Sequence, residues 1–161
     1  MIMIMTKIIK SIICTAAMIV FAAGCSKPSN DIQTLDGKLV GEWHLAQTEY
    51  DGNVLDTNSD VRIAFYADCT FELFQKSGDQ TRYTKFCGTC NFDGKTLSGT
   101  YNDGTPWGST YQVSISGDTL TLTNDTLTET QTYTKEAISE DIRNNADIKV
   151  KSTDNDIIPV L

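Results

Sequence analysis

The stretch QVSISGDTLTLT at residues 112–123 decides the fold class of this chain. Apolar and polar residues alternate on both sides of the pair Gly117-Asp118, which places leucines on one face of residues 119–123 and threonines on the other. Strict alternation is typical of a β-strand with one buried face, and a two-residue connection containing glycine is typical of a hairpin. The stretch therefore predicts two adjacent antiparallel strands.

The same pattern extends along the chain from this hairpin. We predict strands over residues 41–49, 61–67, 70–76, 81–91, 95–102, 107–116, 119–124 and 128–134. Asp-Gly pairs at residues 51–52, 93–94 and 103–104 separate several of them and are too short to hold crossover helices. The sequence thus predicts an all-β fold, an antiparallel meander of about eight strands that closes into a barrel and leaves no exposed sheet edges.

The first 24 residues have the order of an export signal. Lys7 and Lys10 precede a mostly apolar run over residues 11–21, which is too short to span a membrane as a helix. FAAGC at residues 21–25 resembles the lipobox of bacterial lipoprotein signal peptides, in which the peptide is cut before the cysteine and the cysteine carries the lipid. The resemblance implies a lipidated Cys25. An uncleaved anchor and an ordinary secretory signal remain the alternatives, and both also place the remainder outside the cytoplasm.

The remainder divides into three further parts. Residues 25–36 are expected to form a flexible tether, residues 37–138 the barrel domain and residues 139–161 a C-terminal tail. A short helix is expected within residues 136–145, and the apolar stretch IIPVL at 157–161 is expected to dock on the domain. Ser26 is not the Asp that signals inner-membrane retention in enterobacteria. We therefore expect an outer-membrane, lipid-anchored protein, with periplasmic and cell-surface display both open.

The charge of the chain limits its partners. Loss of residues 1–24 removes two lysines and no acids, which leaves 11 basic against 21 acidic residues and a net charge of −10. Nucleic acids and anionic lipid surfaces are bound by clusters of Lys and Arg. We therefore expect no nucleic-acid partner, and a link to the membrane through the lipid on Cys25 alone.

Three cysteines remain in the predicted domain. Cys87 and Cys90 have the spacing of a redox CxxC motif, but strand-like sequence lies on both sides, whereas that motif belongs at the start of a helix. Pairing of residues 70–76 with 81–87 would bring Cys69 close to both. Strand parity favours a disulfide between Cys69 and Cys90, and a bulge at Gly88 would favour Cys87 instead.

Several stretches resemble the small lipocalin-like lipoproteins of Bacteroides and its relatives. The resemblance covers residues 37–138 and rests on LVGEW at 39–43, FELF at 71–74, LSGTYNDGTPWG at 97–108, YQVSI at 111–115, LTLT at 120–123 and TYTK at 132–135. Gly41 and Trp43 match the G-x-W signature of lipocalins, whose Trp packs at the closed end of the barrel. The resemblance implies a meander barrel and suggests a ligand cavity.

Residues that would line such a cavity are the inward-facing apolar and aromatic ones. We select Phe65, Phe71, Leu73, Tyr83, Leu97, Tyr101, Trp107, Tyr111 and Leu122. The alternative is that they simply fill the core, since the interior of an eight-stranded barrel is just wide enough for its own side chains. For Trp107 the two interpretations are an aromatic at the barrel mouth that grips a ligand and an inward-pointing residue at a turn.

We expect a lipid-anchored envelope protein whose barrel binds a small hydrophobic or amphipathic ligand. The alternative is a structural or protein-interaction lipoprotein with a filled barrel and no ligand. Catalysis is not expected, because His44 is the only histidine and no nucleophile motif adjoins it. A pocket that joins His44 to a carboxylate and a hydroxyl would favour an enzyme. The sequence has no metal-ligand pattern or cofactor motif, and we expect neither group.

Overall fold

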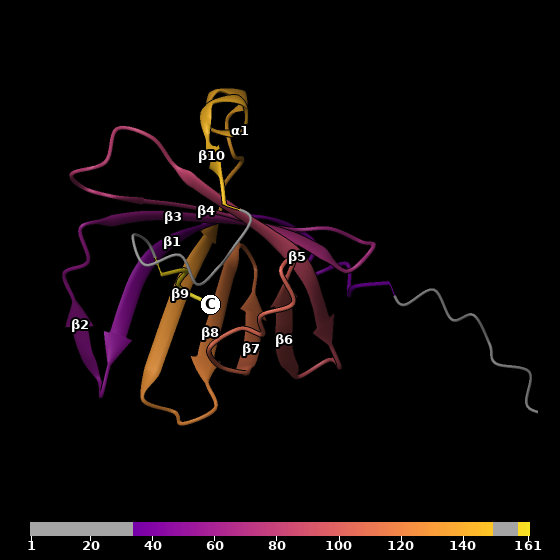
Figure 1. Cartoon of the computed structure of the whole chain (residues 1–161). Helices are drawn as coiled ribbons and strands as arrows, with labels where there is room; N and C mark the ends of the chain where they lie inside the picture. Colours follow the sequence, from indigo (N-terminus) through magenta and orange to yellow (C-terminus); the bar gives the residue numbers. More distant parts are fainter. Residues whose placement is uncertain (1–33, 150–157) are drawn as a thin grey trace, which may run out of the picture. The chain divides into compact units, whose positions relative to one another are not determined.

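The computed structural model of this chain describes residues 34–149 and 158–161 (Figure 1). The expected signal segment, Cys25 and the tether up to residue 33 lie outside the described residues. All the elements discussed below belong to one compact unit, residues 32–161.

Eight antiparallel strands form a closed ring, which confirms the predicted all-β barrel. In chain order they are β1 (Gly41–Tyr50), β3 (Ser59–Phe65), β4 (Thr70–Ser77), β5 (Thr84–Phe92), β6 (Thr96–Tyr101), β7 (Tyr111–Ser116), β8 (Thr119–Asn124) and β9 (Glu129–Lys135). Successive strands pair as a meander, and β1 pairs with β9 to close the ring. A ninth strand, β2 (Asn53–Leu55), extends β1 as a hairpin.

The turns use the backbone conformations that their residues favour. Asp51 and Gly52, which join β1 to β2, both have positive φ, at 48° and 75°. Gly94, Gly104 and Gly117 also have positive φ in the turns that the Asp-Gly and Gly-Asp pairs predict. Strand β7 begins at Tyr111, four residues later than predicted. Trp107 instead bonds through its backbone N–H to the carbonyl of Gly99, at 2.9 Å, and turns into the core.

Trp43 anchors one end of the core. Its indole N–H donates to the carbonyl of Leu39 at 3.0 Å, and the side chain is fully buried. Leu35 and Leu39, from the turn before β1, pack into the same cluster, and the ammonium group of Lys135 lies 5.5 Å from the centre of the Trp43 ring. The structure therefore places Trp43 at the end of the barrel where β1 begins.

The segment after β9 crosses the outer face of the barrel. Helix α1 (Glu140–Asn145) begins after Ser139, whose hydroxyl accepts from the N–H of Ile142 and so caps the helix. A second apolar cluster of Ala64, Phe74 and Ile138 lies beneath this segment. Strand β10 (Asp147–Ile148) then pairs in parallel with β5. The helix lies within the expected residues 136–145, and it starts at Glu140 because the chain before the cap still follows β1, where the N–H of Glu136 bonds the carbonyl of Glu42.

The described residues contain no disulfide, which corrects the prediction of a bridge from Cys69 to Cys90 or Cys87. The predicted proximity is present, because the N–H of Cys90 donates to the carbonyl of Cys69 at 2.7 Å. Burial, with smaller contributions from Cys69 and Asp68, raises the pKa of the Cys90 thiol to about 12. A thiol with that pKa carries almost no thiolate at neutral pH, and the thiolate is the reactive form.

Gly99 of β6 packs closely against the ring of Trp107. A Cβ atom on Gly99 would lie 2.2 Å from Cε2 of Trp107, and this ring is held by its own packed neighbours. We expect Gly99→Ala to lower the free energy of unfolding by about 1–3 kcal/mol, as overpacking does. Urea denaturation measures the change. The matched control is Gly108→Ala, whose Cβ would meet no atom within 4 Å; equal stability of the two variants would contradict the packing described.

Candidate functional site

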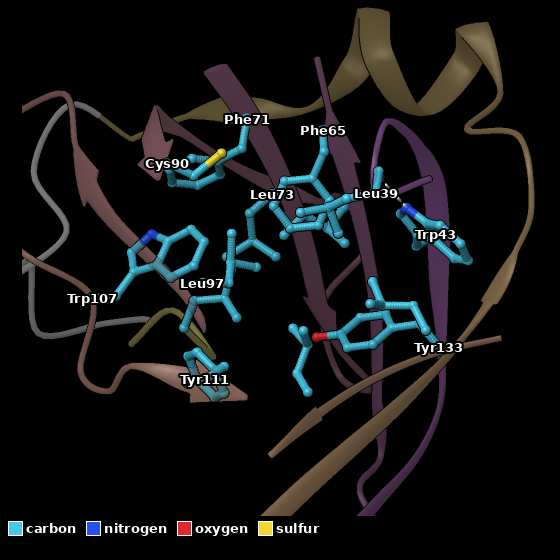
Figure 2. Close-up of a cluster of buried hydrophobic side chains, with 14 of the residues drawn as sticks. Leu39, Trp43, Phe65, Phe71, Leu73, Cys90, Leu97, Trp107, Tyr111 and Tyr133 are labelled. Carbon is cyan, nitrogen blue, oxygen red and sulfur yellow. Dashed lines mark hydrogen bonds between the residues drawn. The ribbon is translucent and has the colours of Figure 1, made fainter. Parts of the chain in front are cut away.

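Eight of the nine residues chosen as cavity wall lie inside the barrel and pack against one another (Figure 2). Phe71 meets Tyr101 and Trp107 edge to face, with ring centroids 5.7 and 5.0 Å apart, and Trp107 meets Tyr111 in the same way at 6.2 Å. This geometry is the favoured one for aromatic pairs. The residues that fill the core in this way are Phe65, Phe71, Leu73, Leu97, Tyr101, Trp107, Tyr111 and Leu122.

Tyr83 is the exception and corrects the sequence prediction. Strand β5 begins at Thr84 and its inward positions are even-numbered, so Tyr83 lies on the outer side. It packs against the outer cluster with Phe74, and its hydroxyl donates to Asp60 at 2.5 Å. Tyr83 therefore belongs to the exterior network described below.

The C-terminal residues 158–161 lie against the barrel, and their last residue is buried within it. Leu161 is buried in the core cluster and Val160 packs against it. Tyr101 donates from its hydroxyl to the backbone oxygen of Leu161 at 2.7 Å. The predicted docking of this apolar stretch is thus confirmed at Leu161, which is buried in the barrel interior, and at Val160, which packs against the core, whereas Ile158 is 80% exposed.

A hollow of about 300 Å³ lies beside this segment at the mouth of the barrel. Its apolar lining comes from Leu45, Leu55, Val61 and Val160, and its polar lining from Thr48, Thr57, Ser59, Glu129 and Gln131. A mostly apolar hollow with a few polar groups is typical of a small-molecule site. None of the residues chosen from the sequence lines it.

A bulge in β1 explains why this hollow was missed. The pairing of β1 with β9 shifts register between Leu45 and Gln47. Plain alternation from Trp43 and Leu45 would point Gln47 inward, but the extra residue reverses the parity and buries Thr48, opposite Gln131. The sequence carried one weak signal of this bulge. Plain alternation would point polar side chains from the second half of β1 into the apolar interior, which is unfavourable.

A chain of hydrogen bonds orients the polar side of the hollow. The hydroxyl of Tyr133, which is fully buried, donates to Oε1 of Gln131 at 2.6 Å. The Nε2 group of Gln131 then donates to Glu129 at 2.7 Å and to the carbonyl of Val160 at 3.2 Å. Because Tyr133 fixes the amide, Gln131 directs its Nε2 group toward the mouth, where Glu129 and Val160 engage both of its N–H groups.

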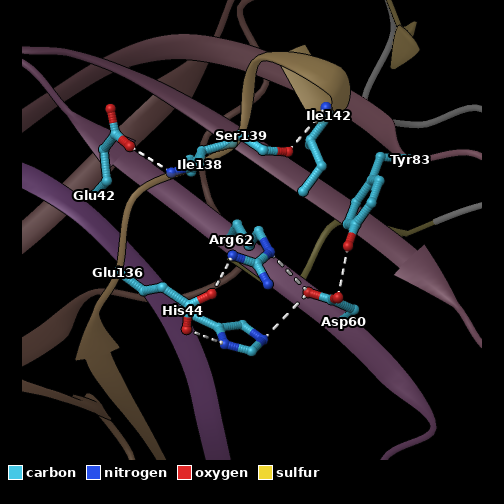
Figure 3. A network of polar contacts seen from close by, with 9 residues as sticks. All are labelled: Glu42, His44, Asp60, Arg62, Tyr83, Glu136, Ile138, Ser139 and Ile142. Carbon is cyan, nitrogen blue, oxygen red and sulfur yellow. Dashed lines mark hydrogen bonds and ion pairs between the residues drawn. The ribbon is translucent and has the colours of Figure 1, made fainter.

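His44 lies on the outside of the barrel in a network of charges (Figure 3). Its Nδ1 lies 3.1 Å from Glu136 and its Nε2 lies 3.3 Å from Asp60, while Arg62 bridges the same two carboxylates. Hydrogen bonds from Arg62 and His44 hold the pKa of Glu136 below its ordinary value. A histidine acting as general base needs one ring nitrogen on a nucleophile, but carboxylates occupy both nitrogens here. A hollow beside His44 is lined by the carboxylate of Asp60 and by Thr57 and Ser59, which is the combination expected to favour an enzyme. The carboxylates on both ring nitrogens suit a clamp between strands better than a catalytic pair.

A second charged cluster fixes helix α1 to the barrel. Arg143 donates to Glu42 and to Glu72, each at 2.7 Å, and the ammonium group of Lys85 also pairs with Glu72. Burial alone would raise the pKa of Glu72, but hydrogen bonds from Lys85 and Tyr66 and the charges of Lys85 and Arg143 outweigh it, so this pKa is lowered. The cluster lies on the outer surface, away from the mouth.

Two features are not found among the described residues: a metal-binding group and a membrane-spanning helix. No group of three or more His, Cys, Asp and Glu side chains among them is placed to hold a metal ion. In the same residues, no helix is long and apolar enough to cross a membrane.

The family of the chain follows from comparison with known proteins. A model of the lipocalin-like domain matches residues 39–142, more than half of the chain, and the chain therefore belongs to the lipocalin-like domain family. The match starts at the Trp43 end of the barrel and ends at Ile142, one residue before Arg143. No curated protein matches the chain.

Several solved structures are similar to the chain at low identity, and the first of these has the same fold. A lipocalin-like protein from Bacteroides uniformis is 24% identical, covers 62% of this chain and 100% of its own, and superposes with a TM-score of 0.50. An uncharacterized protein from Bacteroides eggerthii is 16% identical over 61% of this chain and 99% of its own, with a TM-score of 0.46. The lipoprotein YedD from Klebsiella pneumoniae is 12% identical over 69% of this chain and 83% of its own, with a TM-score of 0.45.

Glu72 provides a prediction about stability and pH. Because the folded-state pKa of Glu72 is lowered, its carboxylate stabilises the fold fully above the ordinary value of 4.5, and this stabilisation is lost as pH falls through the folded value. We expect Glu72→Gln to cost about 1–3 kcal/mol of unfolding free energy at pH 7, the range for hydrogen bonds to a charged partly buried group. Urea titrations from pH 7 to pH 3 should show this difference shrinking. Glu140→Gln, on the exposed start of α1, is the control; a cost that does not change with pH would contradict the assignment.

Proposed function

We propose that this chain is a lipid-anchored envelope protein whose barrel mouth binds a small apolar or amphipathic ligand. The observation that carries the proposal is the hollow beside Val160, which has apolar walls and a few oriented polar groups. Membership in the lipocalin-like domain family supports a binding role, since that fold typically binds and does not catalyse. The carboxylates on both ring nitrogens of His44 argue against this residue as a general base.

The polar groups of the hollow suggest what the ligand carries. Both N–H groups of Gln131 are engaged by Glu129 and Val160, and Glu129 places a carboxylate at the same rim. On a chain with this acidic balance, an anionic head group would be repelled there. The ligand that fits has an uncharged polar end and an apolar body that contacts Leu45, Leu55 and Val61.

The second candidate, a protein-interaction lipoprotein without a ligand, also has an observation in its favour. The barrel interior is filled by its own side chains, and exposed apolar residues gather near the mouth. Tyr50, Val54 and Leu55 lie on the β1–β2 hairpin, and the backbone N–H of Asp51 bonds the carbonyl of Thr128, next to the exposed Leu127. A partner protein would cover these side chains, whereas a small ligand would enter beside them.

Two neighbouring residues on β2 test the ligand site. Leu55 lines the hollow and is 43% exposed, whereas Val54 is 64% exposed and faces away. We expect Leu55→Asp to weaken the binding of Nile red, a neutral apolar dye, roughly tenfold through loss of apolar contact. Val54→Asp should bind the dye as the wild type does. Fluorescence titration measures both, and an equal response of the two variants, or no binding to the wild type, would count against a ligand at the mouth.

The lipid anchor is tested at Cys25. If the lipid is the sole tether, Cys25→Ser should move the protein from the membrane fraction to the soluble fraction of its host, because an acidic domain adds no attraction for anionic lipid. Membrane fractionation followed by immunoblotting measures the distribution. Cys90→Ser, at a buried core position, is the control for loss of a thiol as such. A Cys25→Ser protein that stays with the membrane would refute lipid anchoring.

A further inference from the structure

The side chains around residues 158–161 contact the backbone of this segment as a strand partner would. Gln75 donates from Nε2 to the carbonyl of Ile158 at 3.1 Å and accepts at Oε1 from the N–H of Val160 at 3.2 Å. One side-chain amide thus bonds the carbonyl of one residue and the N–H of the residue two positions later. This pair of bonds requires a peptide group and is not satisfied by a hydrocarbon.

Three more donors converge on the same segment. The hydroxyl of Tyr101 bonds the oxygen of Leu161 at 2.7 Å, the hydroxyl of Tyr111 lies 3.4 Å from the carbonyl of Val160, and Gln131 bonds that carbonyl at 3.2 Å. Burial raises the pKa of both tyrosines, so their hydroxyls stay protonated and donate. Gln75 and Gln131 are themselves 7% and 2% exposed.

These polar groups would be costly to leave without a partner. A buried donor that loses its acceptor keeps the full penalty of leaving water, whereas an occupant with carbonyl groups removes that penalty. The apolar part of the same site is equally specific, because the Leu161 side chain lies in the core cluster and Val160 borders the hollow. The site therefore matches an extended peptide with branched apolar side chains.

We propose that the barrel mouth is a peptide-recognition site, filled in this structure by the chain's own residues 158–161, and that an external apolar peptide takes their place when they leave. This inference rests on the proposed function, since it names the ligand class of the same mouth. Docking of residues 158–161 would then also regulate access to the peptide site. The internal segment is always present at high effective concentration, so an external peptide must compete with it.

The test uses the full chain and a fluorescently labelled Ile-Pro-Val-Leu peptide as the probe. Leu161→Asp places a charge in the core and should release the segment. We expect the peptide to bind this variant at least tenfold more tightly than it binds the wild type, as measured by fluorescence anisotropy. Leu127→Asp, at an exposed position outside the site, should behave as the wild type does. Should Leu161→Asp not fold, Leu161→Ala is the milder variant for the same comparison.

A second substitution tests the mode of recognition. Adding Gln75→Leu to the released variant keeps a similar side-chain volume but removes both bonds to the peptide backbone, and it should weaken peptide binding at least tenfold. Equal peptide binding to wild type and Leu161→Asp, or binding unaffected by Gln75→Leu, would overturn the proposal. The peptide site and the small-ligand site can fail separately. If the wild type binds Nile red but the variant does not bind the peptide, the peptide site alone is refuted. If the variant binds the peptide but the wild type does not bind Nile red, the small-ligand site alone is refuted.

Discussion

The pairing of β1 with β9 is the constraint on which the rest of the molecule depends. It joins the first and last strands of the meander and so turns a sheet into a closed ring. Closure at eight strands fixes an interior that side chains can just fill. Trp43, the aromatic cluster around Phe71 and Leu161 together fill it. The hollow at the mouth is the space that these groups leave.

The closing pair also shapes the site. The register shift after Leu45 turns Thr48 inward opposite Gln131, which gives an otherwise apolar interior its polar rim. The charged clusters on the outside of the barrel hold its elements together. His44 and Arg62 tie β1 and β3 to the end of β9, and Arg143 ties α1 to β1 and β4. The groups proposed for binding therefore lie at the mouth of the barrel, and the charged clusters that fix α1 and the strands lie outside it.

The sequence predicted the parts of this structure that local chemistry controls. Alternation such as that in residues 119–123, and glycine at positive-φ turns such as Gly117, set the strands and their order. The sequence did not predict the hollow at the mouth. Its lining residues Leu45, Val61 and Gln131 come from three strands, and no glycine marks the bulge in β1 after Leu45. Tyr83 was placed on the wrong side because its sequence neighbourhood did not reveal that the inward positions of β5 are even-numbered. The docking of residues 158–161 on the barrel depends on distant partners such as Gln75 and Tyr101, which no local pattern reveals.

The most direct test of this account is whether Leu161 lies inside the barrel in solution. Nuclear Overhauser effects from its methyl groups, measured in the isotope-labelled full chain, report this position. The account predicts cross-peaks to the interior aromatic rings, including Tyr101, with methyl shifts displaced by ring currents. Leu161 methyl signals at the shifts of an unfolded chain, with no cross-peak to any interior ring, would contradict it.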